Sequence, residues 1–312
     1  MTPAFTTLGE EAVSRQILTY SNDAHTNLPR VIEWDGWGKR KDQLYTTEGW
    51  RKLKEFWARS GLMHDFYSRP YGAQSRIVGW TKLVQTWRQN ADSRYYLIAA
   101  SLGGTTCPMA MTDGAARCLE VHGRKDIRDI SIPRLTASDP EQLWTSGQWM
   151  TERPGGSDVS MTETRAYPQS DHTWTIKGFK WFSSATDSDI TLLLAKTPNS
   201  DKVSLFWARV KNEDGSLNGV RIIRLKDKFG TKSIPTAELE LTGMKNAVMI
   251  GKEGEGVKVI SEVLNITRVH CAFGCVTNMR RAFDIVTVYP VLSVNLISGL
   301  FPETKSIRTI AD

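Results

Sequence analysis

The stretch Gln148–Ser160 reads Gln-Trp-Met-Thr-Glu-Arg-Pro-Gly-Gly-Ser-Asp-Val-Ser, and the interpretation of the whole chain starts from it. A short apolar run ends here in a Pro-Gly-Gly turn at residues 154–156. Proline fixes φ and offers no N–H, whereas paired glycines let backbone N–H groups approach a ligand closely. Together with the hydroxyls of Thr151 and Ser157, such a turn can bind an anionic or carbonyl-bearing ligand. The same sequence is also typical of a plain surface turn.

The part of the chain before this turn has a helical period. Apolar residues recur at helical spacing in five segments, which are residues 10–23, 47–60, 76–89, 93–102 and 106–121. Residues 28–43 are rich in tryptophan and glycine and are predicted to form a loop packed on the surface. The tryptophans of the first 125 or so residues could stack on a cofactor or a nucleic acid, but at helical spacing tryptophans are more often part of the core. Residues 1–145 are therefore predicted to form an all-α domain.

After residue 146 the period changes to that of strands. Short apolar or alternating segments are separated by Gly, Asn, Asp, Ser and Pro, and they cover residues 174–177, 179–183, 190–196, 203–210, 219–225 and 237–241. Short strands at near-regular spacing predict a small antiparallel barrel or sandwich over residues 146–243. Residues 244–286 carry one long helix with a broad apolar face, the start of an incomplete C-terminal helical domain. The predicted fold class is α+β.

The helical pattern of apolar residues is lost at the end of the chain. Residues 287–312 contain β-branched residues and Pro290, and they are predicted to form a divergent tail in which the long helix ends. We interpret this change of pattern as a C-terminal truncation.

Composition limits the class of protein. The 312 residues are 40% hydrophobic, which is enough for two domains with cores. No uninterrupted apolar run reaches transmembrane length, and no secretory, mitochondrial or peroxisomal signal is recognised, so we expect an intracellular, cytoplasmic protein without a membrane partner. The net charge of +6 is spread over the chain, which favours solvated faces over a nucleic-acid site. The four cysteines lack the spacing of a disulfide framework or a zinc site, so we predict reduced thiols and no metal.

A second stretch, Lys177–Ser184, identifies a family together with the first. Met-Thr-Glu-x-x-Gly-Gly-Ser-Asp-Val, followed by Gly-x-Lys-Trp-Phe-Ser, resembles the signature pair of the acyl-CoA dehydrogenase flavoprotein superfamily. Two further motifs, at residues 224–230 and 279–283, are similar to the AidB-like branch, which is of the adaptive-response and isovaleryl type. The resemblance extends from about Leu28 to about Val286.

The resemblance implies a flavoprotein that oxidises the CH–CH group of acyl thioesters. A carboxylate would remove the α proton of an acyl-CoA while FAD accepts the β hydride. Seven residues match the family's cofactor contacts: Met150 and Thr151 at the flavin pyrimidine edge, Gly156 and Ser157 on the phosphate and acyl-CoA side, and Trp181, Phe182 and Ser183 around the flavin ring. Ser183 would place its hydroxyl near N5, and Ser157 would also contact the substrate. Glu152 matches a structural position of the family.

The resemblance leaves the catalytic base unknown. In most members of the family the base is a glutamate of the C-terminal domain, which we expect to be missing from this chain. In isovaleryl-type members the base lies on the long helix just before an arginine, and the matching position here is Thr267, before Arg268. Threonine does not accept a proton usefully at neutral pH without a neighbouring base. His270 lies three residues further on and stays a candidate, although a lone histidine on such a helix is commonly a packing residue.

Three interpretations of function remain open at this point. The first is the acyl-CoA dehydrogenase, a homo-oligomer when complete, because the family closes its FAD site across a dimer interface. The second is a DNA-associated flavoprotein of the alkylation-damage response. The third is a fragment that neither holds FAD nor turns over substrate.

Overall fold

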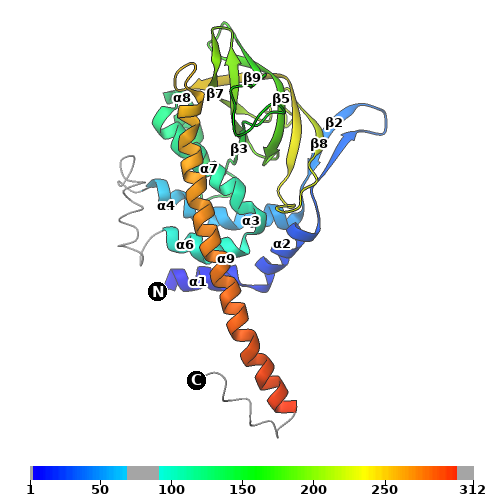
Figure 1. Ribbon diagram of the computed structural model, residues 1–312, viewed down its shortest axis with the longest axis vertical. Helices are drawn as coiled ribbons and strands as arrows, with labels where there is room; N and C mark the ends of the chain where they lie inside the picture. The colour runs from blue at the N-terminus through cyan, green and yellow to red at the C-terminus, as the bar shows by residue number, and fades with distance from the viewer. Residues whose placement is uncertain (1–2, 69–90, 301–312) are drawn as a thin grey trace.

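The computed structural model describes residues 3–68 and 91–300 of the chain. It confirms the α+β class: helices form one half of the molecule, a β-barrel forms the other, and a long helix runs along both (Figure 1). The predicted helix at residues 76–89 lies outside the described residues.

The helical half contains the predicted helices with some changes. Its helices are α1 (Pro3–Ala12), α2 (Arg15–Thr26), α3 (Glu48–Arg59), α4 (Leu62–Ser68), α6 (Ala91–Ile98), α7 (Thr106–His122) and α8 (Lys125–Leu135), with two 3₁₀ turns, η1 (Ala99–Ser101) and η2 (Gly103–Thr105). The predicted opening helix is two helices, because Ser14 interrupts it and caps α2 by accepting a hydrogen bond from the N–H of Ile17. Thr47 caps α3 in the same way. Helix α8 was not predicted.

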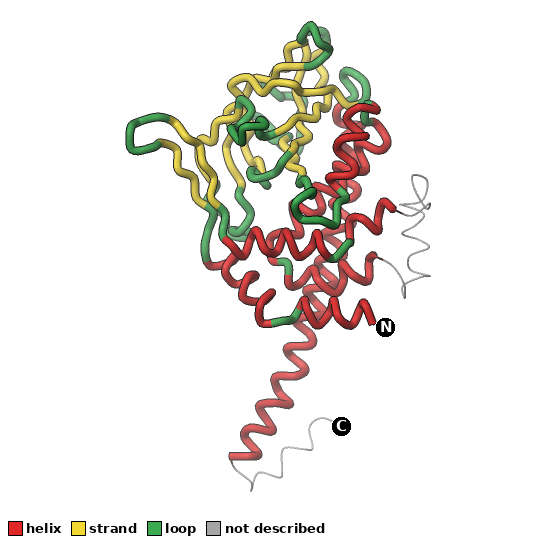
Figure 2. The backbone as a smooth tube through the Cα atoms, turned by 180° about the vertical axis from the view of Figure 1, so that it is seen from behind, coloured by secondary structure: helices red, strands yellow, loops and turns green. Residues whose placement is uncertain are grey.

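The prediction of a loop at residues 28–43 is wrong. This segment forms a β-hairpin of β1 (Arg30–Trp34) and β2 (Arg40–Tyr45), which protrudes from the molecule (Figure 2). Gly38, with φ of 76°, lies in the turn between the strands. The guanidinium of Arg40 stacks 5.1 Å from the ring of Trp34 and donates to the carbonyl of Ile222 at 2.8 Å, which attaches the hairpin to the barrel. In this segment, glycine allows the turn of the hairpin, and Trp34 stacks against Arg40.

The β-half is a closed barrel. Its strands are β3 (Ser146–Trp149), β4 (Arg165–Pro168), β5 (Trp174–Ser184), β6 (Ile190–Thr197), β7 (Ser200–Arg209), β8 (Val220–Leu225) and β9 (Thr236–Ile250). Pairing runs from β4 through β5, β9, β7 and β6 back to β4, so the ring of strands closes. Strand β6 pairs in parallel with β3 and β4, which the prediction of an antiparallel barrel did not include. The inner face is apolar, with Leu193, Phe206 and Leu239 fully buried.

A second core joins the barrel to the helices. Ala115 and Leu119 of α7 pack with Leu192 of β6 and with Val263 of the long helix. Gly114 allows this approach, because a Cβ atom there would lie 2.7 Å from Cγ1 of Val263. Helix α7 is thus held between the barrel and the long helix.

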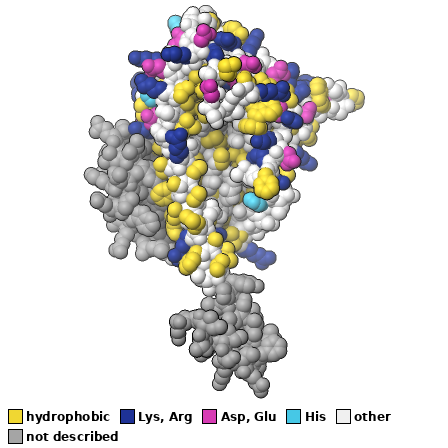
Figure 3. Space-filling view, viewed as in Figure 1, with side chains coloured by type: hydrophobic (Ala, Val, Ile, Leu, Met, Phe, Trp, Pro, Cys, Tyr) yellow, Lys and Arg dark blue, Asp and Glu magenta, His cyan; other side chains and the backbone are white. Residues whose placement is uncertain are grey.

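The long helix α9 (Gly256–Leu300) does not end at Pro290, and the prediction that it does is wrong. Proline has a φ suited to a helix, so it removes one backbone hydrogen bond without forcing the chain to leave the helix. The first half of α9 packs against α7 and β7, and the second half extends away from the body (Figure 1). Apolar side chains line its exposed face (Figure 3), with Val276, Met279 and Phe283 each about half exposed or more.

By length and composition, residues 256–288 of α9 are long and apolar enough to cross a membrane. The core helix of a globular protein passes the same test, and the first half of α9 is packed against α7 and β7. The length and composition of α9 therefore do not show that the protein lies in a membrane.

Asp187, in the turn before β6, connects α3 to the barrel. Its Oδ2 accepts from Nε1 of Trp50 at 2.8 Å and from Nζ of Lys54 at 3.1 Å. We expect Asp187→Ala to lower the free energy of unfolding by about 1–3 kcal/mol, because it leaves the buried indole N–H without its acceptor. Urea unfolding measures the change. Asp201→Ala, at an exposed position of β7, is the control and should have little effect; equal effects of the two variants would contradict the prediction.

Candidate functional site

A buried ion pair anchors the loop that follows β3. The ammonium Nζ of Lys180 lies 2.6 Å from Oε1 of Glu152 and donates to the carbonyl of Leu194 at 2.7 Å. The Lys180 side chain is 0% exposed and that of Glu152 is 3% exposed. The second oxygen of Glu152 accepts from the backbone N–H groups of Glu163 at 2.6 Å and Thr164 at 3.3 Å. Glu152 is therefore a structural carboxylate and is not available as a catalytic base.

Charge keeps this carboxylate ionised. Burial by itself raises the pKa of Glu152, but the Lys180 ammonium and the hydrogen bonds to the carboxylate outweigh burial and bring the pKa below its usual value. Burial lowers the pKa of Lys180, and the negative charge of Glu152 opposes this shift. Each charge is thus stabilised by the other.

The Pro-Gly-Gly turn is tight. A Cβ atom on Gly155 would lie 2.1 Å from the carbonyl oxygen of Asp158, and one on Gly156 would lie 2.9 Å from Cγ2 of Thr151. Both positions therefore require glycine. Within the described residues, no atom accepts a hydrogen bond from the backbone N–H of Gly156 or Ser157. The loop thus presents two N–H donors beside the exposed hydroxyl of Ser157.

The loop and strand β5 meet directly. The backbone N–H of Trp181 donates to the carbonyl of Thr151 at 2.9 Å, so the two motifs found in the sequence lie together in space. Phe182 is 39% exposed, and Nζ of Lys226 lies 3.4 Å from the centre of its ring. Met150 is partly buried and packs against the core between the barrel and the helices.

The two serines at the end of β5 differ in their surroundings. Ser183 is 1% exposed, and its Oγ is buried without a hydrogen-bond partner. Ser184 is partly exposed, and its Oγ lies 3.0 Å from Oγ1 of Thr236. A shift in the pairing of β5 with β9, between Lys180 and Ser183, makes this part of the strand irregular. The partly exposed serine is therefore Ser184, which the sequence analysis did not select.

Lys228 completes this hydroxyl network. Its Nζ donates to Oγ1 of Thr236 at 2.9 Å and to the carbonyls of Thr231 at 2.6 Å and Ile234 at 2.7 Å. Burial lowers the pKa of Lys228 to about 8. Strand alternation could have suggested Ser184, but only the tertiary fold brings Lys228 to it.

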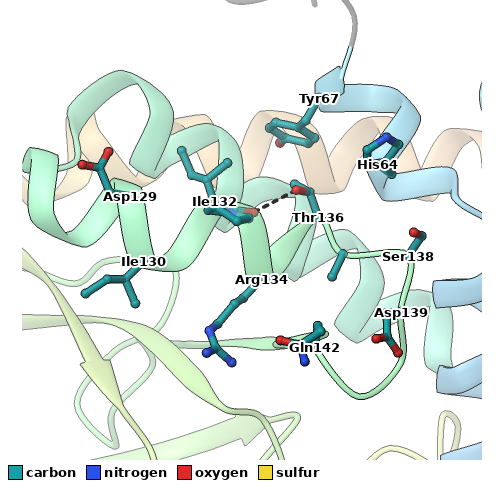
Figure 4. Close-up of a pocket in the computed structure, with 12 residues that line it drawn as sticks. His64, Tyr67, Asp129, Ile130, Ile132, Arg134, Thr136, Ser138, Asp139 and Gln142 are labelled. Atoms are coloured by element: carbon teal, nitrogen blue, oxygen red, sulfur yellow. Dashed lines mark hydrogen bonds between the residues drawn. The ribbon is translucent and has the colours of Figure 1, made fainter.

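An open groove lies elsewhere on the molecule, between α4 and α8 (Figure 4). The side chains of Arg134, Thr136 and Gln142 lie on one side of it, and those of His64 and Tyr67 lie on the other. None of the seven residues predicted to contact a cofactor lines this groove.

The two base candidates on α9 have different partners. Oγ1 of Thr267 donates to the carbonyl of Leu264 in its own helix at 3.0 Å, so it is bound to the backbone. Nε2 of His270 lies 2.8 Å from Oδ2 of Asp113 on α7, and each of these residues is 7% exposed. Asp113 was not recognised in the sequence as a partner of His270, because 157 positions separate them.

The Lys180–Glu152 ion pair predicts that the difference in stability between wild type and a Glu152→Gln variant depends on pH. At neutral pH we expect Glu152→Gln to lower the free energy of unfolding by about 3–5 kcal/mol, because it leaves a buried ammonium without a counter-charge. The folded-state pKa of Glu152 is depressed, so its contribution is present above the usual carboxyl pKa of 4.5 and is lost as the pH falls through the folded value. The difference between wild type and variant should therefore shrink below about pH 4.5 in urea titrations.

Glu253→Gln, on the exposed turn before α9, is a matched control and should differ little from wild type at any pH. A Glu152→Gln difference that stays constant down to pH 3 would contradict the assignment.

Comparison with known proteins identifies the family. A model described as "Acyl-CoA dehydrogenase, middle domain" matches residues 147–244, and one described as "Adaptive response protein AidB N-terminal domain" matches residues 1–141. The chain is 36% identical to acyl-CoA dehydrogenase family member 11 of Caenorhabditis elegans over 95% of its length and 47% of the relative's. It is 29% identical to the putative acyl-CoA dehydrogenase AidB of Escherichia coli (strain K12) over 89% of its length and 50% of the relative's.

Solved structures agree with this. The apo-form of Bd2924 has a TM-score of 0.82 and 41% identity, covering 91% of this chain and 56% of that one. Caenorhabditis elegans ACDH-11 in complex with C11-CoA has a TM-score of 0.74 and 35% identity, covering 90% and 50%. The chain spans about half the length of the curated relatives described above. It belongs to the acyl-CoA dehydrogenase superfamily, in the AidB-like branch.

Proposed function

We propose that this chain forms part of an FAD-dependent oxidoreductase that acts on the CH–CH group of acyl thioesters. The observation that carries the proposal is the hydrogen bond from Trp181 to Thr151, which joins the Pro-Gly-Gly loop to the end of β5. The two motifs that resemble the family's flavin contacts thereby form one surface. A relative in the same family, ACDH-11, has been solved with C11-CoA, which supports acyl-CoA as the substrate class.

The residues of this surface fit FAD. The partly exposed ring of Phe182 offers a flat apolar surface to a flavin, and the hydroxyl of Ser184 offers a hydrogen bond beside it. The free N–H groups of Gly156 and Ser157 and the ammonium of Lys226 suit anionic phosphates. The hydroxyl of Ser183 is buried and has no hydrogen-bond partner among the described residues.

These residues would bind and orient, while the cofactor would supply the redox chemistry. Bound FAD would accept the hydride that leaves the β carbon of the thioester. Phe182 would support the ring, and Lys228, through Thr236, would hold the hydroxyl of Ser184 in one orientation. We therefore propose Ser184 in place of Ser183 as the hydroxyl beside the flavin, and we keep the other six predicted contacts.

A DNA-associated role is a second candidate, because residues 1–141 match the AidB N-terminal domain and the net charge is +6. Several basic side chains of the described structure are already paired with acids, as Arg221 is with Glu240 and Arg280 is with Asp284. Such pairing weakens the field that would attract a polyanion. The dehydrogenase-like function is better supported.

Titration of the purified chain with FAD tests the proposal through the change in flavin absorbance and fluorescence. We expect Lys228→Met to weaken FAD binding about tenfold, which corresponds to about 1.4 kcal/mol, because the Thr236–Ser184 network loses its donor. Lys232→Met makes the same charge change at an exposed position and should bind FAD like wild type. A wild-type chain that takes up no FAD would contradict the proposed function for this polypeptide. Equal weakening by both variants would contradict the role of Lys228.

A further inference from the structure

An arginine covers two aromatic rings on the outer face of the barrel, in the Pro-Gly-Gly loop. The guanidinium carbon of Arg153 lies 4.9 Å from the centre of the Phe179 ring and 5.0 Å from the centre of the Trp181 ring. The two rings lie 6.2 Å apart on β5. A planar guanidinium over aromatic rings at these distances is stabilised by cation–π attraction and by stacking. We call Arg153 and these two rings the Arg153 platform.

The turn of the loop places Arg153 at the surface. The backbone N–H of Glu152 donates to the carbonyl of Gly155 at 3.1 Å, and the N–H of Gly155 donates back to the carbonyl of Glu152 at 3.2 Å. Arg153 and Pro154 are therefore the two central residues of a tight turn. Glu152 is held in the interior by its ion pair with Lys180. Arg153 follows it outward, and its side chain is 66% exposed.

Two neighbouring strands supply a carboxylate and a second arginine beside the Arg153 platform. In β9, Leu239 faces the core of the barrel, so the adjacent Glu238 faces outward. Glu238 pairs in register with Arg224 of β8. Its Oε1 lies 2.5 Å from Nη2 of Arg224, and its Oε2 lies 3.8 Å from Nη2 of Arg153. One carboxylate thus holds two arginines in place.

Charge and exposure leave this cluster open to a ligand. Glu238 is 4% exposed, whereas the side chain of Arg224 is 64% exposed. Two guanidiniums share one carboxylate, which leaves one positive charge in excess. The contact between Glu238 and Arg153 is longer than a hydrogen bond, so the N–H donors of Arg153 are not taken up by this carboxylate. The guanidinium of Arg153 therefore offers both its N–H donors and its outer face.

The Arg153 platform adjoins the candidate cofactor site. The ring of Phe182, which we propose as the support for a flavin, lies 5.2 Å from the ring of Trp181. The backbone N–H groups of Gly156 and Ser157, which donate to no atom of the described residues, follow directly after the turn that carries Arg153. A long ligand that contacts Phe182 can therefore also reach the platform.

The chemistry of the platform fits an adenine nucleotide. A guanidinium binds phosphate oxygens through two N–H groups at once, and it stacks on purine rings. We propose that the Arg153 platform binds the adenosine diphosphate group, which FAD and CoA have in common. The adenine stacks on the outer face of the Arg153 guanidinium, whose inner face lies on the two rings, and the N–H groups of Arg153 and Arg224 bind the phosphates. This inference rests on the proposed function, because that function brings FAD and acyl-CoA to this surface.

A nucleic acid fits the same surface less well. Binding along a polynucleotide backbone needs a row of unpaired cations beside the rings. The next outward-facing arginine of β8, Arg221, is paired with Glu240 at 2.8 Å. The row of cations is therefore interrupted, which favours a single nucleotide.

Calorimetry with ADP and the full 312-residue chain tests the platform directly. We expect Arg153→Met to weaken ADP binding about tenfold or more, because the phosphate donors and the stacking face are lost together. Arg153→Lys keeps the charge but lacks the planar fork, so it should bind ADP more weakly than wild type. Arg221→Met is the matched control: it removes one arginine from the same face of the barrel and should bind ADP like wild type. Circular dichroism shows that each variant is folded.

Paired ligands distinguish the two sources of the group. Riboflavin is FAD without the ADP group, and pantetheine is CoA without its nucleotide. If the platform serves FAD, Arg153→Met weakens the binding of FAD about tenfold and leaves that of riboflavin and CoA unchanged. If it serves CoA, the same variant weakens the binding of CoA and leaves that of pantetheine and FAD unchanged. Either result supports the ADP site.

Other outcomes overturn the proposal and leave the proposed function standing. These are an Arg153→Met variant that binds ADP, FAD and CoA like wild type, equal weakening by Arg153→Met and Arg221→Met, and an Arg153→Lys variant that binds ADP like wild type. Arg153-dependent binding of a thymidine oligonucleotide by a chain that does not bind ADP would assign the platform to nucleic acid instead. A chain that shows Arg153-dependent binding of ADP but takes up no FAD would contradict the proposed function and keep the ADP site.

Discussion

The buried ion pair between Lys180 and Glu152 is the interaction on which the candidate site depends. It removes two charges from water, and this desolvation cost is offset because each charge is paired and hydrogen-bonded on other sides as well. Lys180 lies on β5 and also binds the carbonyl of Leu194 on β6, while Glu152 receives two N–H groups from the segment before β4. One pair thus joins the loop to β5, to β6 and to the segment before β4. The contacts with the barrel therefore determine the conformation of the Pro-Gly-Gly loop.

The position of the barrel against the helices is set by a second constraint, the close approach of α7 and α9. Gly114 permits that approach, and α7 also contacts the start of β3, because Oγ1 of Thr112 accepts a hydrogen bond of 3.0 Å from the backbone N–H of Ser146. The same packing brings Asp113 within hydrogen-bonding distance of His270. The Asp113–His270 pair is therefore a consequence of the same close packing of α7 and α9.

Much of the fold could be predicted because its signals are local. Thr47 and the apolar spacing of α3 predict that helix, and the alternating segments of the β-half predict a barrel. The errors have physical causes. The hairpin β1–β2 was mistaken for a loop because tryptophan and glycine obscured its alternation. The end of α9 was placed at Pro290, although proline weakens a helix without necessarily ending it. The parallel pairing of β6 with β3 and β4 depends on topology, which local pattern does not contain.

The sequence by itself determined the family, the Pro-Gly-Gly loop and the strand motif that meets it, because these are contiguous runs whose residue types and spacing can be recognised directly. Only the tertiary structure decided which of the two serines is partly exposed and which acid lies beside the histidine. The irregular pairing of β5 with β9 distinguishes Ser184 from Ser183, and a one-residue change of this kind moves a side chain from one face of a strand to the other. Asp113 and His270 lie 157 residues apart and meet only because two helices pack closely at a glycine.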